Sequence, residues 1–305
     1  MENRKGLTML ELIVVLFTLV FLIILIFPLF STTISYDLPA SRVVCGTNLK
    51  GLGTAMIVYA NDYDDEFPKL GHGPWSKKLG YSYEDADFKP SDYEGPCTIT
   101  SSLYLLVREA DVAPKSFICP QQSNQIEFDG QNSKGLDIVE LWDFGPDPYK
   151  HVSYAYQNPY GKCPPSGIHS AAFAVMADMS PWFMNGDIVN PNTNEKLPPQ
   201  IVDITNTKTF KKSNSLNHTE YEENFLSFYK IKRRSNCGPG QNVLFGDGHT
   251  AFEKSPNVGV KHDNIYTFWS TRDNPTEQDI QGGTAPTSRS PENDAKSTND
   301  SFLGI

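Results

Sequence analysis

Four side chains in the second half of the chain are of the types that hold transition metals in proteins. They are Asp178, His218, Asp247 and His249. Two imidazoles and two carboxylates suit zinc or a related ion, provided that the fold brings them together. No two histidines have the i, i+4 spacing of a metal site on one helix. Hydrogen-bonded turn and loop residues are therefore the competing interpretation.

A second concentration of ligand-type groups is the acidic segment Asn61–Glu66, which carries four carboxylates. Oxygen ligands suit calcium, but the segment lacks the glycine and the distant glutamate of an EF-hand loop. A basic surface on a neighbouring subunit would also offset these charges, and a solvated acidic loop needs no partner. The sequence thus predicts no cofactor, and calcium and zinc are the alternatives that it leaves open.

The motifs of common enzyme classes do not occur in this sequence, which contains no GxSxG, no P-loop and no HExxH. We therefore expect a protein that is not an enzyme. The charge balance of 26 Lys and Arg against 36 Asp and Glu gives a net charge of −10, which argues against a nucleic-acid binder. The basic cluster at 230–234 could contact nucleic acid or an acidic neighbour, but an exposed loop is the simpler interpretation.

The elements that must position these groups are short. Segments 173–178 and 242–245 are apolar and bounded by turn residues, which is typical of strands. Asp247-Gly248 is a hairpin signal, with 249–252 as the returning strand. If the two apolar strands are neighbours, the candidate metal ligands converge. With 22 Gly and 22 Pro, the body is predicted to be a loop-rich α+β domain.

The N-terminal segment differs from the rest of the chain. Residues 12–36 carry no charge, and 12–30 are almost wholly apolar. At about 1.5 Å per residue this run forms roughly 29 Å of helix, which matches a hydrocarbon core of about 30 Å. Arg4 and Lys5 precede the run and place the N-terminus in the cytoplasm, with the remainder exported. A buried soluble helix and a secretory signal cleaved near 38–41 are the alternatives.

An amphipathic helix is predicted after the span. Its apolar stripe recurs at spacings of 4, 3, 4, 3 and 4 residues. The stripe comprises Cys45, Leu49, Leu52, Met56, Tyr59 and Tyr63. A second, short helix is predicted at 102–107. The last segment, 271–305, is rich in Pro, Gly, Ser, Thr and acids, so its composition predicts an extended or disordered tail.

The N-terminus also resembles a known processing site. Residues 5–11, KGLTMLE, followed by the apolar run, are similar to the cleavage and methylation site of type IV prepilins and type II secretion pseudopilins. The resemblance implies that a prepilin peptidase cuts after Gly6 and methylates the new amino group of Leu7. Glu11 would then pair with the N-terminus of a neighbouring subunit during assembly. One departure is the first mature residue, which is usually Phe in these families and is Leu7 here.

Segments of the body resemble a large pilin-like family of planctomycete-type bacteria. They are 41–68, 117–120 and 242–249, the last being similar to the family's C-terminal His-x9-Asp-Gly element. This chain departs from that element at its first position, where Cys237 replaces the histidine. The resemblance implies a pilin-like α+β fold. In that fold a long N-terminal helix, half transmembrane and half amphipathic, packs on a loop-rich antiparallel β domain.

The chain has five cysteines, an odd number, and no CxxC pair, so a zinc ribbon and a thioredoxin-like motif are excluded. Cys45 and Cys119 both fall in segments that resemble the pilin-like family. The resemblance therefore implies a disulfide between these two residues. Buried free thiols are the alternative.

These observations divide the chain into five parts: a leader (1–6), a membrane span (7–30), a stalk (31–66), an exported body (67–270) and a tail (271–305). The expected function is that of a non-enzymatic pilin-like subunit in the inner membrane, with a cytoplasmic N-terminus and a periplasmic or extracellular C-terminal domain. Its expected partners are the prepilin peptidase, other pilin-like subunits and the assembly platform of a type II secretion pseudopilus or type IV pilus-like filament. No nucleic acid is expected among them.

The alternative function is that of a membrane-anchored periplasmic binding protein or metal-dependent hydrolase. Glu11 separates the two hypotheses. A carboxylate at the edge of a lipid-embedded helix is costly unless it has a partner, so a simple anchor gains nothing from it. An assembling helix gains an intersubunit ion pair.

Overall fold

The computed structural model describes residues 9–31, 37–85, 87–120, 122, 125–130, 135–189 and 240–305. In the two N-terminal helices, side chains are described for residues 9–23 and from residue 41 onward. Several features singled out in the sequence lie outside the described residues. These features are Gly6, Leu7, His218, the basic cluster 230–234 and Cys237.

The described residues form helices joined by long loops to short strands. The helices are α1 (Met9–Ser31), α2 (Asp37–Asp62), α3 (Ile99–Glu109) and α5 (Glu277–Gly282). Single 3-10 turns occur at η2 (Pro90–Asp92), η3 (Pro114–Phe117), η4 (Ile138–Glu140) and η5 (Pro148–Lys150). The strands are β1 (Tyr154–Gln157), β2 (Ala174–Asp178), β3 (Phe183–Met184), β4 (Asp187–Ile188), β5 (Gln241–Phe245), β6 (Thr250–Glu253) and β7 (Leu303–Gly304).

The main sheet has the strand order β6-β5-β2-β1-β7, and its neighbouring strands are antiparallel. Strands β2 and β5 are the two predicted apolar strands, and they are neighbours, as the sequence analysis supposed. β5 and β6 form the predicted hairpin, with Gly248 in the left-handed region at φ 79°. Helices and an antiparallel sheet in one body confirm the α+β class.

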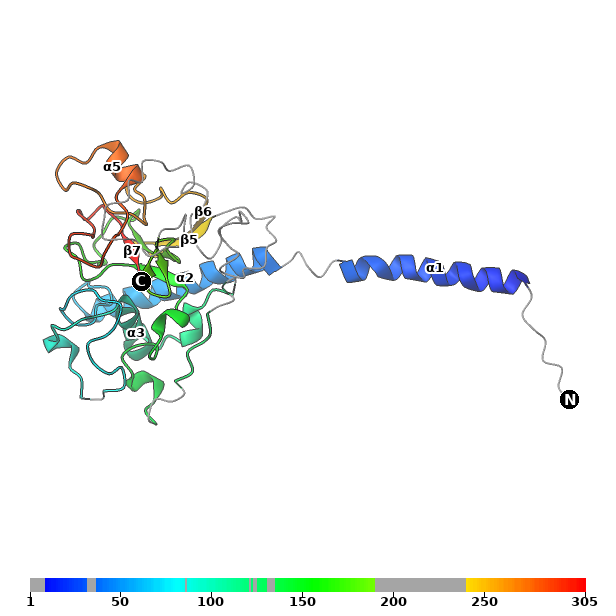
Figure 1. Cartoon of the computed structure of the whole chain (residues 1–305), viewed down its shortest axis with the longest axis horizontal. Coiled ribbons are helices and arrows are strands. Elements are labelled where there is room, and N and C mark those ends of the chain that lie inside the picture. The colour runs from blue at the N-terminus through cyan, green and yellow to red at the C-terminus, as the bar shows by residue number, and fades with distance from the viewer. Residues whose placement is uncertain are drawn as a thin grey trace.

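Helix α2 packs against this sheet. Cys45, Leu49, Leu52 and Met56 are fully buried, so four positions of the predicted stripe form its contact face. The helix lies along β5 and β6, and Figure 1 shows it running across the body. Contact is closest at Gly53, where a Cβ atom would lie 2.5 Å from Leu244 Cδ1. A glycine in the helix interior therefore allows the helix to approach β5.

The stripe ends where α2 ends. Tyr59 is buried, whereas Tyr63 lies one residue beyond the helix and is 43% exposed. The two rings stack with centroids 4.0 Å apart. Tyr63 therefore covers Tyr59 from the solvent side and does not continue the buried face.

Helix α3 contains the predicted segment 102–107 and extends it at both ends. Thr98 is its N-cap, and its side-chain oxygen accepts a hydrogen bond from the backbone N–H of Ser101 at 3.0 Å. Such a cap satisfies one of the free N–H groups at a helix start. Residues 99–107 are all buried, so α3 is a core helix.

The prediction of an extended or disordered tail at 271–305 is wrong. This segment forms α5 and ends in β7, which pairs with β1, and Phe302 and Leu303 are fully buried. Buried carboxylates hold its backbone. Asp300 accepts hydrogen bonds from the N–H groups of Trp269 and Lys296, at 3.0 and 2.6 Å.

The N-terminal part is described as two helices, α1 and α2, and the residues between them lie outside the described ranges. Figure 1 shows α1 pointing away from the body. Its apolar side chains between Met9 and Ile23 are 49–83% exposed. Within the part of the chain that the structure describes, no helix has both the length and the hydropathy needed to cross a membrane.

Candidate functional site

The predicted assembly determinants lie at the N-terminus. Gly6 and Leu7, the predicted cleavage and methylation residues, are outside the described residues. Glu11 lies in the first turn of α1 and is exposed. Among residues 9–23, Glu11 and Thr18 are the polar positions, and all the others are apolar. The carboxylate is therefore placed on an otherwise apolar helix surface.

Cys45 and Cys119 form a disulfide, the pairing that the resemblance implied. Their Cα atoms are 5.2 Å apart, and the bond links α2 to the segment that follows η3. Cys97 and Cys163 are buried free thiols. The alternative of buried free thiols is therefore correct for these two cysteines. Burial raises the pKa of the Cys97 thiol, which keeps the group protonated and unreactive at neutral pH.

Of the predicted metal ligands, Asp178, Asp247 and His249 lie among the described residues, and the structure does not bring these three together. Asp178 is fully buried next to Asn242, near the start of β5, and its carboxylate accepts the Asn242 N–H at 2.6 Å. Asp247 and His249 lie beyond the other end of β5. The three strand steps between Asn242 and Phe245 alone separate the two groups by about 10 Å. Strand register therefore keeps the ligands apart, although the strands are neighbours.

Asp247 and His249 instead interact with each other across the hairpin turn. His249 Nδ1 lies 2.5 Å from Asp247 Oδ1, and the same oxygen accepts the His249 N–H at 2.9 Å. These contacts hold the pKa of Asp247 below its usual value. The pair is thus a hydrogen-bonded turn, which was the competing interpretation.

Among the described residues, the one group with ligand atoms at metal-binding distances is Cys45, Cys119 and Asp178, within 4.8 Å of one another. The two sulfurs are bonded to each other, so they do not offer thiolates in this state. The acidic segment Asn61–Glu66 does not form such a group. Its Asp64 and Asp65 have left-handed backbones, at φ 49° and 62°, in the turn that ends α2.

The structure also contains a cavity that the sequence analysis did not predict. Its volume is about 500 Å³, and it lies between segments 77–83 and 143–150, next to the β3–β4 turn at Asn185. The dipeptide Asn185-Gly186 is typical of a hairpin turn, and both residues lie in the left-handed region, at φ 48° and 71°. That dipeptide would have predicted the turn, but not the cavity.

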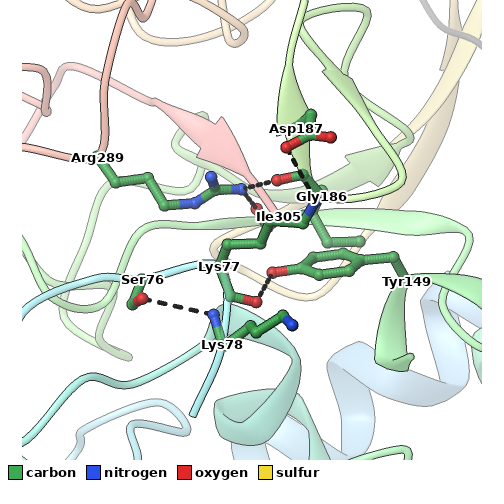
Figure 2. Close-up of polar contacts among 8 residues, drawn as sticks. All are labelled: Ser76, Lys77, Lys78, Tyr149, Gly186, Asp187, Arg289 and Ile305. Atoms are coloured by element: carbon green, nitrogen blue, oxygen red, sulfur yellow. Dashed lines mark hydrogen bonds and ion pairs between the residues drawn. The ribbon is translucent and has the colours of Figure 1, made fainter. Parts of the chain in front are cut away.

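Polar contacts connect the segments around this cavity, and Figure 2 shows them. The Tyr149 hydroxyl donates to the backbone oxygen of Lys77 at 2.6 Å, and Lys77 Nζ lies 2.8 Å from Asp187 Oδ1. Arg289 donates to the backbone oxygens of Gly186 and Ile305, at 2.6 and 3.0 Å. Four segments far apart in the sequence, near residues 77, 149, 187 and 289–305, are therefore held in one arrangement.

Asp143 is also among the residues that line the cavity, and it is 1% exposed. Its Oδ2 accepts the hydroxyls of Thr98 and Thr100, at 2.8 and 3.1 Å, and its Oδ1 accepts the Phe144 N–H at 2.8 Å. Burial raises the pKa of Asp143 to about 7, against the lowering effect of these donors. Desolvation dominates because no cation among the described residues lies within ion-pair distance of the carboxyl group.

Tyr81 also lines the cavity, and its hydroxyl is buried with no hydrogen-bond partner among the described residues. The ring itself is fixed, because it stacks on Phe88 with centroids 3.6 Å apart. An unpaired buried hydroxyl costs about 1–3 kcal/mol. Tyr81 therefore carries an unsatisfied hydroxyl that is packed away from solvent beside the cavity.

Comparison with protein-family models, with curated proteins and with solved structures finds no match for this chain. The function must therefore be argued from the residues themselves.

Proposed function

We propose that this protein is a pilin-like subunit, cut after Gly6 by a prepilin peptidase and assembled through its N-terminal helix. The product would be a type II secretion pseudopilus or a type IV pilus-like filament. The proposal includes a membrane span at residues 12–30 and export of everything that follows it. It rests on the N-terminal motif and on the exposed surface of α1.

The exposed surface of α1 is the observation that carries this proposal. Apolar side chains occur all round the helix, and those between Met9 and Ile23 are at least 49% exposed. A helix that is apolar all round needs cover from lipid or from other protein. The body of this chain does not supply it, since α1 points away from the body (Figure 1). A membrane before assembly, and neighbouring α1 helices after it, would supply that cover.

Glu11 favours assembly over simple anchoring. In a bundle of such helices, each incoming subunit brings a charged amino terminus into an apolar environment. Glu11 lies four residues from Leu7, about one helical turn, so it is within reach of a neighbour's N-terminus. The next acidic residue is Asp37, beyond the proposed span, and cannot replace it.

Replacing Glu11 by leucine (Glu11→Leu) is expected to lower the amount of protein in filaments or crosslinked oligomers by about tenfold or more. Membrane insertion and removal of the leader should be unaffected, because the change makes the span more apolar. The measurement is crosslinking and sedimentation of filaments from cells that supply a prepilin peptidase and an assembly platform.

Thr18→Leu is the matched control, since it adds a similar apolar side chain to the same helix and keeps the carboxylate. It should assemble as well as the unmodified chain. Assembly of Glu11→Leu at the level of this control would contradict the proposal and favour an anchored binding protein.

A further inference from the structure

A second cavity lies where helices α2 and α3 end. Its volume of about 400 Å³ is within the usual range of about 300–1,000 Å³ for ligand sites. Tyr59 and Tyr63 line it from the end of α2. Leu105 and Glu109 line it from the end of α3. Each helix C-terminus carries a partial negative charge of about half an elementary charge, so two such ends favour a cation between them.

Carboxylates add to this negative charge. Glu66 and Glu109 line the cavity, and both are exposed. Burial raises the pKa of the Tyr59 hydroxyl, and the charges of Glu109 and Glu66 raise it further. Burial likewise raises the pKa of Tyr63, together with the charges of Glu109 and Asp62. The carboxylates are therefore close enough to act on both hydroxyls, and the last turn of α2 contains no basic residue.

The cations at this place do not neutralise the carboxylates. Lys69 lines the cavity but forms no ion pair with a carboxylate of the described residues. Burial raises the pKa of the Cys97 thiol and the Lys69 charge lowers it, so that charge acts on the Cys97 side. Arg108 Nε lies 3.9 Å from Glu109 Oε1, but its guanidinium is stacked on the Trp142 ring, 3.5 Å from the centroid. The cavity therefore keeps an excess of negative charge.

The hydroxyl of Tyr59 is the observation that points to a ligand. The residue is only 7% exposed, and its hydroxyl forms no hydrogen bond with the described part of the chain. This oxygen is not among the polar atoms that packing closes off from solvent, so the small exposed part of Tyr59 includes it. Because Tyr59 lines the cavity, a group bound there can reach the hydroxyl.

Tyr63 supplies an aromatic surface beside that hydroxyl. Its ring stacks on Tyr59, with centroids 4.0 Å apart and planes at 7° to each other. The side chain is nevertheless 43% exposed, so ring surface that does not contact Tyr59 is open to a ligand. Aromatic faces attract cations, and arginine more often than lysine.

The spacing of the carboxylates selects the kind of cation. Within the described ranges, no three acidic or histidine side chains around this cavity bring ligand atoms within 4.8 Å of one another. They are therefore too far apart to hold one metal ion together. A guanidinium group is larger and planar, carries five N–H donors and stacks on aromatic rings. An ammonium group is compact and strongly hydrated, and suits this arrangement less well.

We propose that this cavity binds an arginine side chain of a partner protein. The guanidinium stacks on the Tyr63 ring, and its N–H groups donate to Glu66, Glu109 and the Tyr59 hydroxyl. The inference goes beyond the proposed assembly function and does not depend on it.

The test is a ligand-observed NMR titration of the full-length chain in an uncharged detergent. The probes are three tripeptides with blocked ends and glycine on both sides of arginine, lysine or citrulline, an uncharged analogue of arginine. The arginine peptide should bind about tenfold or more tightly than the citrulline peptide, and about threefold or more tightly than the lysine peptide. If either of these peptides binds as tightly as the arginine peptide, or if the arginine peptide does not bind, the proposal is overturned.

Three variants connect the binding to the named groups. Glu66→Gln and Glu109→Gln together should weaken binding of the arginine peptide about tenfold, through loss of charge-assisted hydrogen bonds. Tyr63→Leu should weaken it about threefold, through loss of the stacking surface. Tyr59→Phe keeps the ring and should also weaken it about threefold, through loss of one acceptor. The unfolding temperature of each variant separates a lost contact from a misfolded protein.

The matched control for charge replaces two carboxylates outside the cavity, Glu127→Gln with Glu292→Gln. Both residues are exposed, and neither lines the cavity. This control should bind the arginine peptide like the unmodified chain. Equally tight binding by the Glu66→Gln, Glu109→Gln protein and by the control would place the peptide elsewhere and overturn the proposal.

Discussion

Replacing Cys45 and Cys119 together by alanine is expected to lower the free energy of unfolding by about 4 kcal/mol. The disulfide closes a loop with a sequence separation of 74 residues, and crosslinks that close long loops restrict the unfolded chain most. It also joins α2 to the segment after η3 at a fully buried position. The measurement is chemical denaturation of the full-length chain in detergent.

Cys97→Ala is the control for loss of a buried sulfur, because Cys97 is a free thiol that is also fully buried. It should cost only about 1 kcal/mol. A double variant that is no less stable than Cys97→Ala would show that the disulfide does not stabilise this fold.

Raising the pH from about 4 to about 8 is expected to destabilise the body by several kcal/mol. Burial raises the pKa of Asp143 to about 7, of Asp294 to about 6 and of Asp300 to about 7. Asp263 lies near Asp300, and burial together with that second carboxylate raises its pKa well above the usual value.

The direction follows from proton binding. In the folded protein these carboxyl groups keep their protons until the pH approaches 6–7. In the unfolded chain they release them near pH 3.8, the ordinary pKa of an Asp carboxyl group. The stabilising contribution is therefore complete below about pH 4 and is lost as the pH rises through the folded-state pKa. For Asp143 alone, the difference between 3.8 and about 7 corresponds to roughly 4 kcal/mol.

Denaturation curves at a series of pH values test this expectation. Asp143→Asn should flatten the loss of stability between about pH 5 and pH 8, because the amide does not titrate. Asp147→Asn is the control, since Asp147 is exposed and Lys150 lowers its pKa, so it should leave that slope in place. Stability that stays level or increases over this interval in the unmodified chain would contradict the expectation.

Periodic patterns in the sequence predicted the elements that bury a continuous face. The stripe from Cys45 to Met56 became the buried face of α2, and the Asp247-Gly248 signal became the β5–β6 turn. In both cases the information is local, because spacing along the chain decides which side chains share a face.

Composition did not predict that the C-terminal segment is ordered. It reflects the number of apolar residues but not the buried carboxylates that accept backbone hydrogen bonds. Asp263 and Asp300 hold this segment through bonds to backbone N–H groups of Ser301, Trp269 and Lys296. Carboxylates in a sequence normally indicate exposed chain. Only the three-dimensional contacts show that these two are buried.

The candidate sites required information that strand patterns do not contain. The sequence predicted that the strands next to Asp178 and Asp247 are neighbours. It did not predict the register, which places the two carboxylates at opposite ends of β5. The cavity is formed by segments near residues 77, 143 and 185, and no motif connects them. Long-range packing between loops thus determined what the sequence analysis missed.

The intact mass of the mature protein, purified from cells that express a prepilin peptidase, tests the central claim most directly. The account predicts loss of residues 1–6, a chain that begins at Leu7 with one added methyl group, and retention of the full leader in Gly6→Val. A chain that still begins at Met1 in the presence of an active peptidase, or one that begins near Ser41, would contradict the account.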